Sequence, residues 1–140
     1  MFLSEGTVDK GTVAIANIDP NVKNFVKKWF DNNKITNAEY TRYARIGTTH
    51  NYGTTSSIQG SSTLLAKFLD SFVGHGSHNK YVPDAAFTAP EEFITGLLNG
   101  YIAGDGYVRE YGIETSSVSR RITEGIATLC NRLGVFGYIS

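Results

Sequence analysis

Three glycines recur at every fourth position in the apolar segment 93–108, whose sequence is FITGLLNGYIAGDGYV. The apolar stretch predicts a helix, although each glycine in a helix interior costs about 1 kcal/mol relative to alanine. A spacing of four residues places Gly96, Gly100 and Gly104 on one helix face, where a second backbone can approach closely. The sequence therefore predicts a tight helix–helix contact that ends beside Asp105, where the partner helix would bring a second acid.

A second copy of this helix end lies at the start of the chain. Residues 2–8 (FLSEGTV) align with residues 102–108 (IAGDGYV), and the two segments share an apolar residue, an acid, a glycine and a valine at matching positions. Each copy is followed by a predicted helix, at residues 19–33 and 119–133. An internal repeat of this kind predicts two similar halves, in which Glu5 and Asp105 occupy equivalent positions.

The remaining elements follow from periodicity, capping residues and turn residues. Asp19 is expected to cap a helix that has Pro20 at its first position, and Thr88 with Glu91 is expected to form a capping box for the glycine-rich helix. The predicted strands lie at 11–18, 39–46, 51–58 and within 107–115, and a further helix runs from about 62 to 72. The apolar face of the helix at 19–33 is expected to contain Val22, Phe25, Val26, Trp29 and Phe30.

Composition supports a globular domain and excludes several classes of site. The chain has 140 residues, of which 41% are hydrophobic, so it is long enough for a compact core. Its single cysteine, Cys130, excludes a disulfide framework and a cysteine-rich zinc site, and the three histidines lack metal-ligand spacing. There is neither a membrane-length apolar run nor a secretory leader, which predicts an intracellular protein, in the cytoplasm, the nucleoid or, for a eukaryotic or viral source, the nucleus.

Charge is unevenly distributed although the formal net charge is zero. Residues 20–50 contain six basic and two acidic residues, whereas residues 84–114 are strongly acidic. The basic segment would suit a nucleic acid backbone, but charge alone favours the alternative, an ordinary solvated face.

Residues 96–106 (GLLNGYIAGDG) resemble the LAGLIDADG motif of homing endonucleases, in the DOD-type form found within inteins. Residues 78–83 (HNKYVP) resemble the Lys-x-x-Pro block that precedes the second motif of that family, and residues 116–134 resemble the helix that follows it. The resemblance covers most of the chain in order. It implies an α+β fold of two pseudo-symmetric αββαββα-like halves, whose antiparallel strands form a DNA-binding saddle.

The resemblance also implies that both halves are incomplete. The first half, 1–88, begins only four residues before Glu5, where family members have a whole helix. The second half, 89–140, stops where a third strand would begin, so its last strand and helix are missing. The chain is therefore expected to be an internal fragment, completed by missing complementary segments or by a second copy in a homodimer.

The paired acids fit metal-dependent phosphodiester hydrolysis. Mg²⁺ binds one or two carboxylates and keeps several waters, and it can activate water and neutralise phosphate charge. The expected ligands are Glu5 and Asp105, helped by backbone carbonyls near Ser4 and Gly104, and the resemblance places Lys80 at the cleavage centre. The alternatives are structural: an Asp-Gly turn, a helix-end carboxylate and a solvated loop lysine.

Strand residues of suitable types would contact the major groove of double-stranded DNA. The expected contacts are Tyr40, Arg42, Arg45, His50, Asn51, Tyr52 and Thr54 in the first half and Arg109 and Tyr111 in the second. Side chains alternate between the two faces of a strand, and the sequence leaves open which face meets DNA. The alternation would also arise if one face simply packed on the core.

The predicted function is therefore site-specific, Mg²⁺-dependent cleavage of double-stranded DNA by a homing endonuclease derived from an intein. The junction residues of protein splicing are not found in the chain, so splicing is not predicted. A catalytically inactive LAGLIDADG DNA-binding module, acting as a regulator or maturase-like protein, is the alternative from another class, and a gene remnant is the third.

Overall fold

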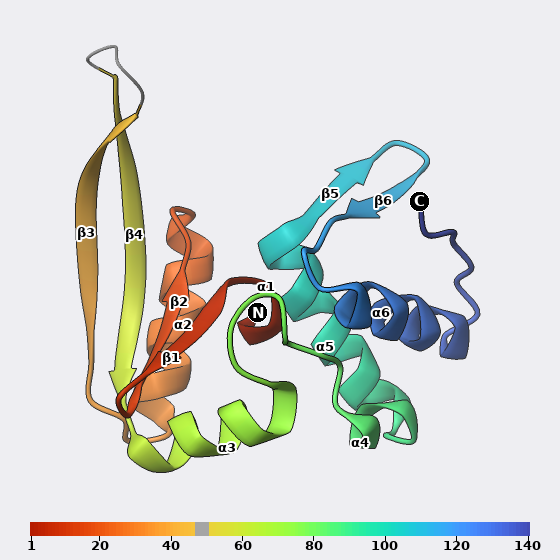
Figure 1. Cartoon of the computed structure of the whole chain (residues 1–140), viewed down its shortest axis with the longest axis horizontal. Helices are drawn as coiled ribbons and strands as arrows, with labels where there is room; N and C mark the ends of the chain where they lie inside the picture. The colour runs from red at the N-terminus through yellow and green to blue at the C-terminus, as the bar shows by residue number, and fades with distance from the viewer. Residues whose placement is uncertain (47–50) are drawn as a thin grey trace. The chain divides into compact units, whose positions relative to one another are not determined.

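The computed structural model describes residues 1–46 and 51–140 (Figure 1). The chain divides into two compact units, one of Gly6–Lys67 and the other of Met1–Glu5 with Phe68–Ser140. Helices and antiparallel strands occur in both units. Within the described residues, no helix combines the length and apolar character needed to cross a bilayer.

The unit of Gly6–Lys67 is built on a four-stranded antiparallel sheet with the strand order β1-β2-β4-β3. Its strands are β1 (Gly6–Asp9), β2 (Thr12–Ala16), β3 (Asn37–Ile46) and β4 (Asn51–Ser61). The long hairpin of β3 and β4 pairs Asn37 with Gly60 at one end and Ile46 with Asn51 at the other. These strands confirm the pair expected at 39–46 and 51–58.

Helix α2 (Pro20–Asn32) packs on this sheet. The side chain of Asp19 accepts a hydrogen bond from the backbone N–H of Asn21 at 2.8 Å, so the predicted cap is confirmed. Phe30 is buried, and its ring lies over Gly60, where an added Cβ would come within 2.5 Å of the ring. Glycine at position 60 therefore makes room for the largest core side chain of this unit.

The second unit contains a helical layer and a short hairpin. Helix α3 (Thr63–Val73) begins in the first unit and ends in this one. The other elements are α1 (Phe2–Glu5), α4 (Asp84–Phe87), α5 (Glu91–Asp105), the hairpin of β5 (Gly106–Arg109) and β6 (Gly112–Thr115), and α6 (Arg120–Arg132). Their shared core includes Ile94, Leu98 and Tyr101 of α5 and Ile122 and Leu129 of α6.

The internal repeat is present in the structure at a constant offset of one hundred residues. Strands β1 and β5 begin at Gly6 and Gly106, and helices α2 and α6 span Pro20–Asn32 and Arg120–Arg132. In each copy a helix ending in an acid leads into a hairpin and then into a capped helix. The division of the whole chain into halves at residue 88 stays a prediction.

The expected capping box before α5 is wrong. The N-cap of α5 is Pro90, whose side chain accepts no hydrogen bond, and Thr88 instead ends the short helix α4. The backbone N–H of Thr88 bonds to the carbonyl of Ala86, so this residue is committed to the preceding helix. Arg132 supports the same segment, because its guanidinium donates to the carbonyls of Phe87 and Ala89 at 2.9 and 2.8 Å.

Candidate active site

Two of the three motif glycines lie against helix α1. A Cβ added to Gly100 would lie 2.8 Å from the backbone nitrogen of Met1, and one added to Gly104 would lie 2.8 Å from Cβ of Ser4 and 3.2 Å from Cγ of Glu5. The predicted close helix contact is therefore confirmed at these two positions. At Gly96 the predicted contact is wrong, since an added Cβ would meet no described atom within 4 Å. Helix α1 has only four residues, so it does not extend along α5 as far as Gly96.

This contact brings together the two predicted acids, because Glu5 ends α1 and Asp105 ends α5. Both carboxylates act electrostatically on the same positive charge, the amino group of Met1. Burial lowers the pKa of that amino group to about 6, and the attraction of Glu5 and Asp105 opposes the decrease. The two carboxylates therefore act on one electrostatic environment, where their attraction for the amino group is smaller than the cost of burying it.

Lys80 is buried beside the same helix, with 4% of its surface exposed. Its ammonium donates a hydrogen bond to the carbonyl of Phe2 at 2.9 Å and makes a longer contact, 3.5 Å, with the carbonyl of Leu3. It also lies 4.8 Å from the centroid of the Phe2 ring, which is a cation–π distance. Burial lowers the pKa of Lys80, and the negative charge of Asp105 partly offsets this decrease.

Asp105 is accessible and yet electrostatically perturbed. The residue is exposed, while partial burial of its carboxyl raises the pKa, against the opposing positive charges of Lys80 and the amino terminus. A carboxylate that is incompletely neutralised and reachable from solvent is well suited to bind an added cation.

A cavity of about 350 Å³ opens beside these groups. Its wall includes Lys80, Asp105 and the serines Ser4, Ser77, Ser116 and Ser117. Tyr101 is buried next to this wall, because its side chain is hydrogen-bonded to those of Thr115 and the lining residue Ser117. The cavity therefore combines a cation, an acid and several hydroxyl groups.

Ser119 is a site-supporting residue that the sequence analysis missed. Its hydroxyl donates to the backbone carbonyl of Lys80 at 2.6 Å and accepts from the backbone N–H of Ile122 at 3.3 Å. The position at the start of a predicted helix indicates a cap. The contact with Lys80 joins residues 39 positions apart, which local patterns do not reveal.

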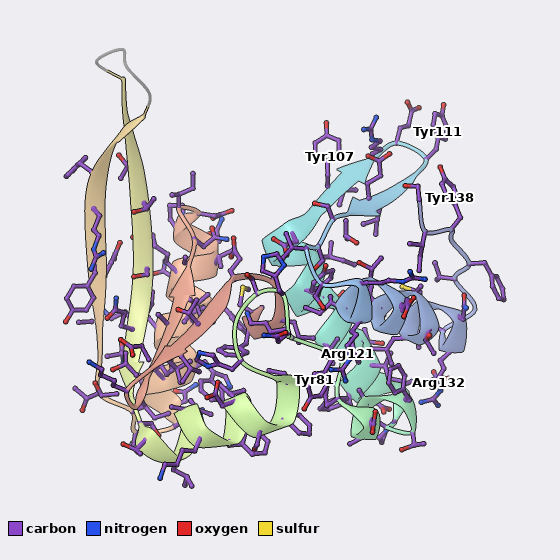
Figure 2. All side chains as sticks on the ribbon, in the orientation of Figure 1. Tyr81, Tyr107, Tyr111, Arg121, Arg132 and Tyr138 are labelled. Carbon is purple, nitrogen blue, oxygen red and sulfur yellow. The ribbon has the colours of Figure 1, made fainter. Side chains whose placement is uncertain are left out.

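The structure describes only some of the residues predicted to contact DNA. Tyr40 and Arg42 on β3 are exposed, and so is Thr54 on β4. Tyr111 is 91% exposed at the turn of β5 and β6, and Arg109 pairs with Glu114 at 2.8 Å; Figure 2 shows Tyr107 and Tyr111 extending outward from this hairpin. His50 lies outside the described residues, and the side chains of Arg45, Asn51 and Tyr52 lie outside those that are described.

The donor set fits a hard divalent cation better than a transition metal. Among the described residues, no group of three or more His, Cys, Asp or Glu side chains could hold a metal ion. Two carboxylates at adjoining helix ends are instead the ligand number that Mg²⁺ uses when it retains its waters.

Comparison with known families agrees with this arrangement. Residues 92–140, which include α5, the β5–β6 hairpin and α6, match the model of the LAGLIDADG-like domain. This part of the chain is similar to the LAGLIDADG-like domain. The resemblance predicted from residues 96–106 is thus confirmed.

Two curated proteins contain segments similar to nearly the whole chain. The DNA-directed RNA polymerase subunit Rpo1C of Methanocaldococcus jannaschii is 33% identical over 138 residues, which are 97% of this chain and 15% of that protein. The ATP-dependent DNA helicase Hel308 of Thermococcus kodakarensis is 26% identical over 148 residues, covering 96% of this chain and 12% of that protein. The chain therefore spans less than a sixth of the length of these curated relatives.

The fold is similar to that of I-DmoI, in a crystal structure of its complex with DNA and Mn. The two structures superpose with a TM-score of 0.63 at 12% identity, covering 99% of this chain and 76% of that one. This similarity confirms the predicted α+β fold of LAGLIDADG homing endonucleases.

Proposed function

We propose that this chain belongs to the catalytic part of a homing endonuclease that hydrolyses double-stranded DNA with a divalent metal ion. The observation that carries the proposal is the pairing of Glu5 and Asp105 at the ends of two helices packed through Gly104. The LAGLIDADG-like domain and the similarity to a DNA-bound structure support it.

The two acids would hold the metal, with backbone carbonyls near Ser4 and Gly104 as additional ligands. A divalent cation bound there supplies an activated water and neutralises charge on the phosphate. Mg²⁺ is the ion we expect from two carboxylates, and the I-DmoI complex contains Mn. The raised pKa of Asp105 fits this role, because an added cation would favour its ionised form.

Lys80 would act beside the metal ligands. Its ammonium is held at the first turn of α1 and lines the same cavity as Asp105. From that position it would polarise the attacking water or stabilise the charge that develops on the phosphate. Lys80 is buried, so its surroundings are poorly hydrated, which strengthens such an interaction.

The strands would bind the DNA target. Tyr40, Arg42 and Thr54 on the long hairpin and Tyr111 on the short one are exposed groups of types that contact bases or phosphates. Arg45, His50, Asn51, Tyr52 and Arg109 complete the set that we assign to DNA contacts.

The relatives support an origin within an intein. Segments similar to this chain occur in an RNA polymerase subunit, a helicase, a probable translation initiation factor and DNA polymerases, and cover at most 15% of each. These proteins differ in function, so the simplest explanation for the short segment that they share is an inserted element. The halves at 1–88 and 89–140, and their completion by a second copy or by further segments, belong to the same proposal.

Cleavage and binding of a randomised DNA duplex library, with and without Mg²⁺ or Mn²⁺, test the function. We expect metal-dependent cleavage that Asp105→Ala abolishes, while Asp9→Asn, a change at an exposed acid on β1, retains it. Selective binding without cleavage by either protein would favour the inactive DNA-binding module. Absence of both activities would contradict the proposal for this chain.

A further inference from the structure

Lys80 is fixed at both ends by different helices. Its ammonium bonds to the carbonyl of Phe2 in α1, and its backbone carbonyl accepts a hydrogen bond from the hydroxyl of Ser119, the N-cap of α6. The backbone N–H of Lys80 donates a hydrogen bond to the carbonyl of Gly76 in the preceding loop, at 3.2 Å. A lysine side chain has four rotatable bonds, so fixing the backbone greatly reduces the positions that its ammonium can reach.

Ser119 performs two functions with one hydroxyl group. It accepts the N–H of Ile122, which caps α6, and it donates its proton to Lys80. The residue is 1% exposed, so water does not compete for either bond. A hydroxyl has a single proton to donate, so the proton of Ser119 is committed to the carbonyl of Lys80.

The internal repeat supplies a comparison for this cap. Asp19 occupies the equivalent position before α2, and its carboxylate accepts a hydrogen bond from Asn21. Serine and aspartate are about equally good caps, so capping alone does not require serine at position 119. An ionised aspartate has no proton to donate, and it could not hold the carbonyl of Lys80.

We infer that Ser119 is a positioning residue, which holds the backbone of Lys80 so that its ammonium reaches the metal-binding acids. The inference rests on the proposed nuclease function for its consequence in catalysis. The geometric part, that Ser119 determines the position and accessibility of Lys80, is independent of that function.

The experiment compares Ser119→Gly and Ser119→Thr with Asp19→Gly. Glycine replaces a serine cap at little cost in stability, so Ser119→Gly removes the hydroxyl while α6 remains folded. Threonine retains a hydroxyl that can donate and accept. Asp19→Gly removes the equivalent cap from α2 and controls for the loss of a cap as such.

The first readout is the rate of acetylation of Lys80 as a function of pH, followed by mass spectrometry without DNA. We expect Ser119→Gly to increase the rate of Lys80 modification about tenfold, as the loss of one hydrogen bond allows. Ser119→Thr should restore the slow rate, and Asp19→Gly should leave it unchanged. An unchanged rate in Ser119→Gly would overturn the inference whether or not the chain cleaves DNA.

The second readout is single-turnover cleavage of a library-selected DNA site. Ser119→Gly should lower the rate about tenfold and shift its pH profile, while Asp19→Gly should do neither. Equal effects of the two glycine variants would show that Ser119 is only a helix cap. If the unmodified chain cleaves no DNA, the proposed function fails, and the acetylation result still decides the role of Ser119.

Discussion

The ammonium of Lys80 lies 2.9 Å from the carbonyl oxygen of Phe2, a residue 78 positions earlier in the chain. The hydrogen bond ties the loop before α4 to the first turn of α1, whose last residue is Glu5. Lys80 therefore does not simply approach the two acids in space; it helps to hold the helix that carries one of them. A substitution of Lys80 would disturb α1 as well as the chemistry proposed for Lys80, so Asp105 is the clearer position at which to test the site.

Asp105→Asn should increase the stability of the metal-free protein at neutral pH. The folded-state pKa of Asp105 lies above its ordinary value of 3.8, so the folded chain binds the proton more tightly than the unfolded chain does. The unmodified protein therefore loses stability as the pH rises from 3.8 through the raised folded-state pKa, because Asp105 must ionise in the folded chain. Asparagine does not ionise, so the variant does not lose this stability. Thermal unfolding at pH 4 and pH 7 should show a larger advantage for the variant at pH 7.

Asp9→Asn, on the exposed surface of β1, controls for the removal of one negative charge. Addition of Mg²⁺ should stabilise the unmodified protein more than Asp105→Asn. An advantage of the variant that is larger at pH 4 than at pH 7 would be incompatible with a raised pKa.

Alanine substitutions at Gly104 and Gly96 should have opposite effects on stability. At Gly104 the new methyl group would overlap Ser4 and crowd Glu5, so α1 must move away from α5, at a cost of about 1–3 kcal/mol. At Gly96 no described atom lies within 4 Å, and alanine should stabilise the helix by up to about 1 kcal/mol. Urea denaturation measures both changes.

Catalysis provides a second comparison of the same pair. Gly104→Ala should abolish metal-dependent cleavage, because it separates Glu5 from Asp105, while Gly96→Ala should retain it. Destabilisation by Gly96→Ala would indicate that this helix face is covered in solution.

Gly60→Ala should destabilise the unit of Gly6–Lys67 through the ring of Phe30. Three ring atoms of Phe30 would lie 2.5–2.7 Å from the new Cβ, and the ring, buried in the core, has little room to move. The expected cost is about 1–3 kcal/mol, the range of overpacked cores. Gly112→Ala on β6 is the control, because no described atom lies within 4 Å of its Cβ position; equal losses of stability in both variants would exclude the steric explanation.

The sequence predicted those parts of the fold that depend on local patterns. The cap at Asp19, the hairpin of β3 and β4 and the repeated helix ends all follow from residue type and spacing, and the structure contains them. The box at Thr88–Glu91 failed because a short helix, α4, precedes it and uses Thr88 at its own end. The end of α4 and the start of α5 are only a few residues apart, so Thr88 could belong to either helix. The sequence does not show which helix uses it, because that depends on how each segment packs.

The candidate site was predictable only in part for a similar reason. The repeat placed Glu5 and Asp105 at equivalent positions, and the resemblance supplied Lys80. The hydroxyl of Ser119 and the cavity wall at Ser77, Ser116 and Ser117 depend on how the loop before α4 meets the start of α6. Serines in polar loops carry no distinguishing pattern, so only the tertiary structure brings them into the site.

Alanine substitutions at Trp29 and Leu129 should cause different losses of stability, although the two residues lie at equivalent positions of the repeat, in α2 and α6. Leu129 is 0% exposed in the core of its unit, whereas Trp29 is 44% exposed, although Trp29 was expected on the apolar face of its helix. Leu129→Ala should cost about 2–5 kcal/mol because it leaves a cavity. Trp29→Ala should cost about 1–2 kcal/mol, from partial burial and the edge contact with Phe30 at 5.7 Å.

Urea denaturation of both variants, with Leu129→Met as a volume-conserving control, measures this difference. The methionine variant should lose less than about 1.5 kcal/mol, since it fills the same space. A loss at Trp29 as large as that at Leu129 would show that α2 is covered in solution on the face that contains Phe25 and Trp29. In α6 the equivalent positions, Gly125 and Leu129, are buried. If Phe25 and Trp29 were covered in solution, the equivalent faces of α2 and α6 would both be buried.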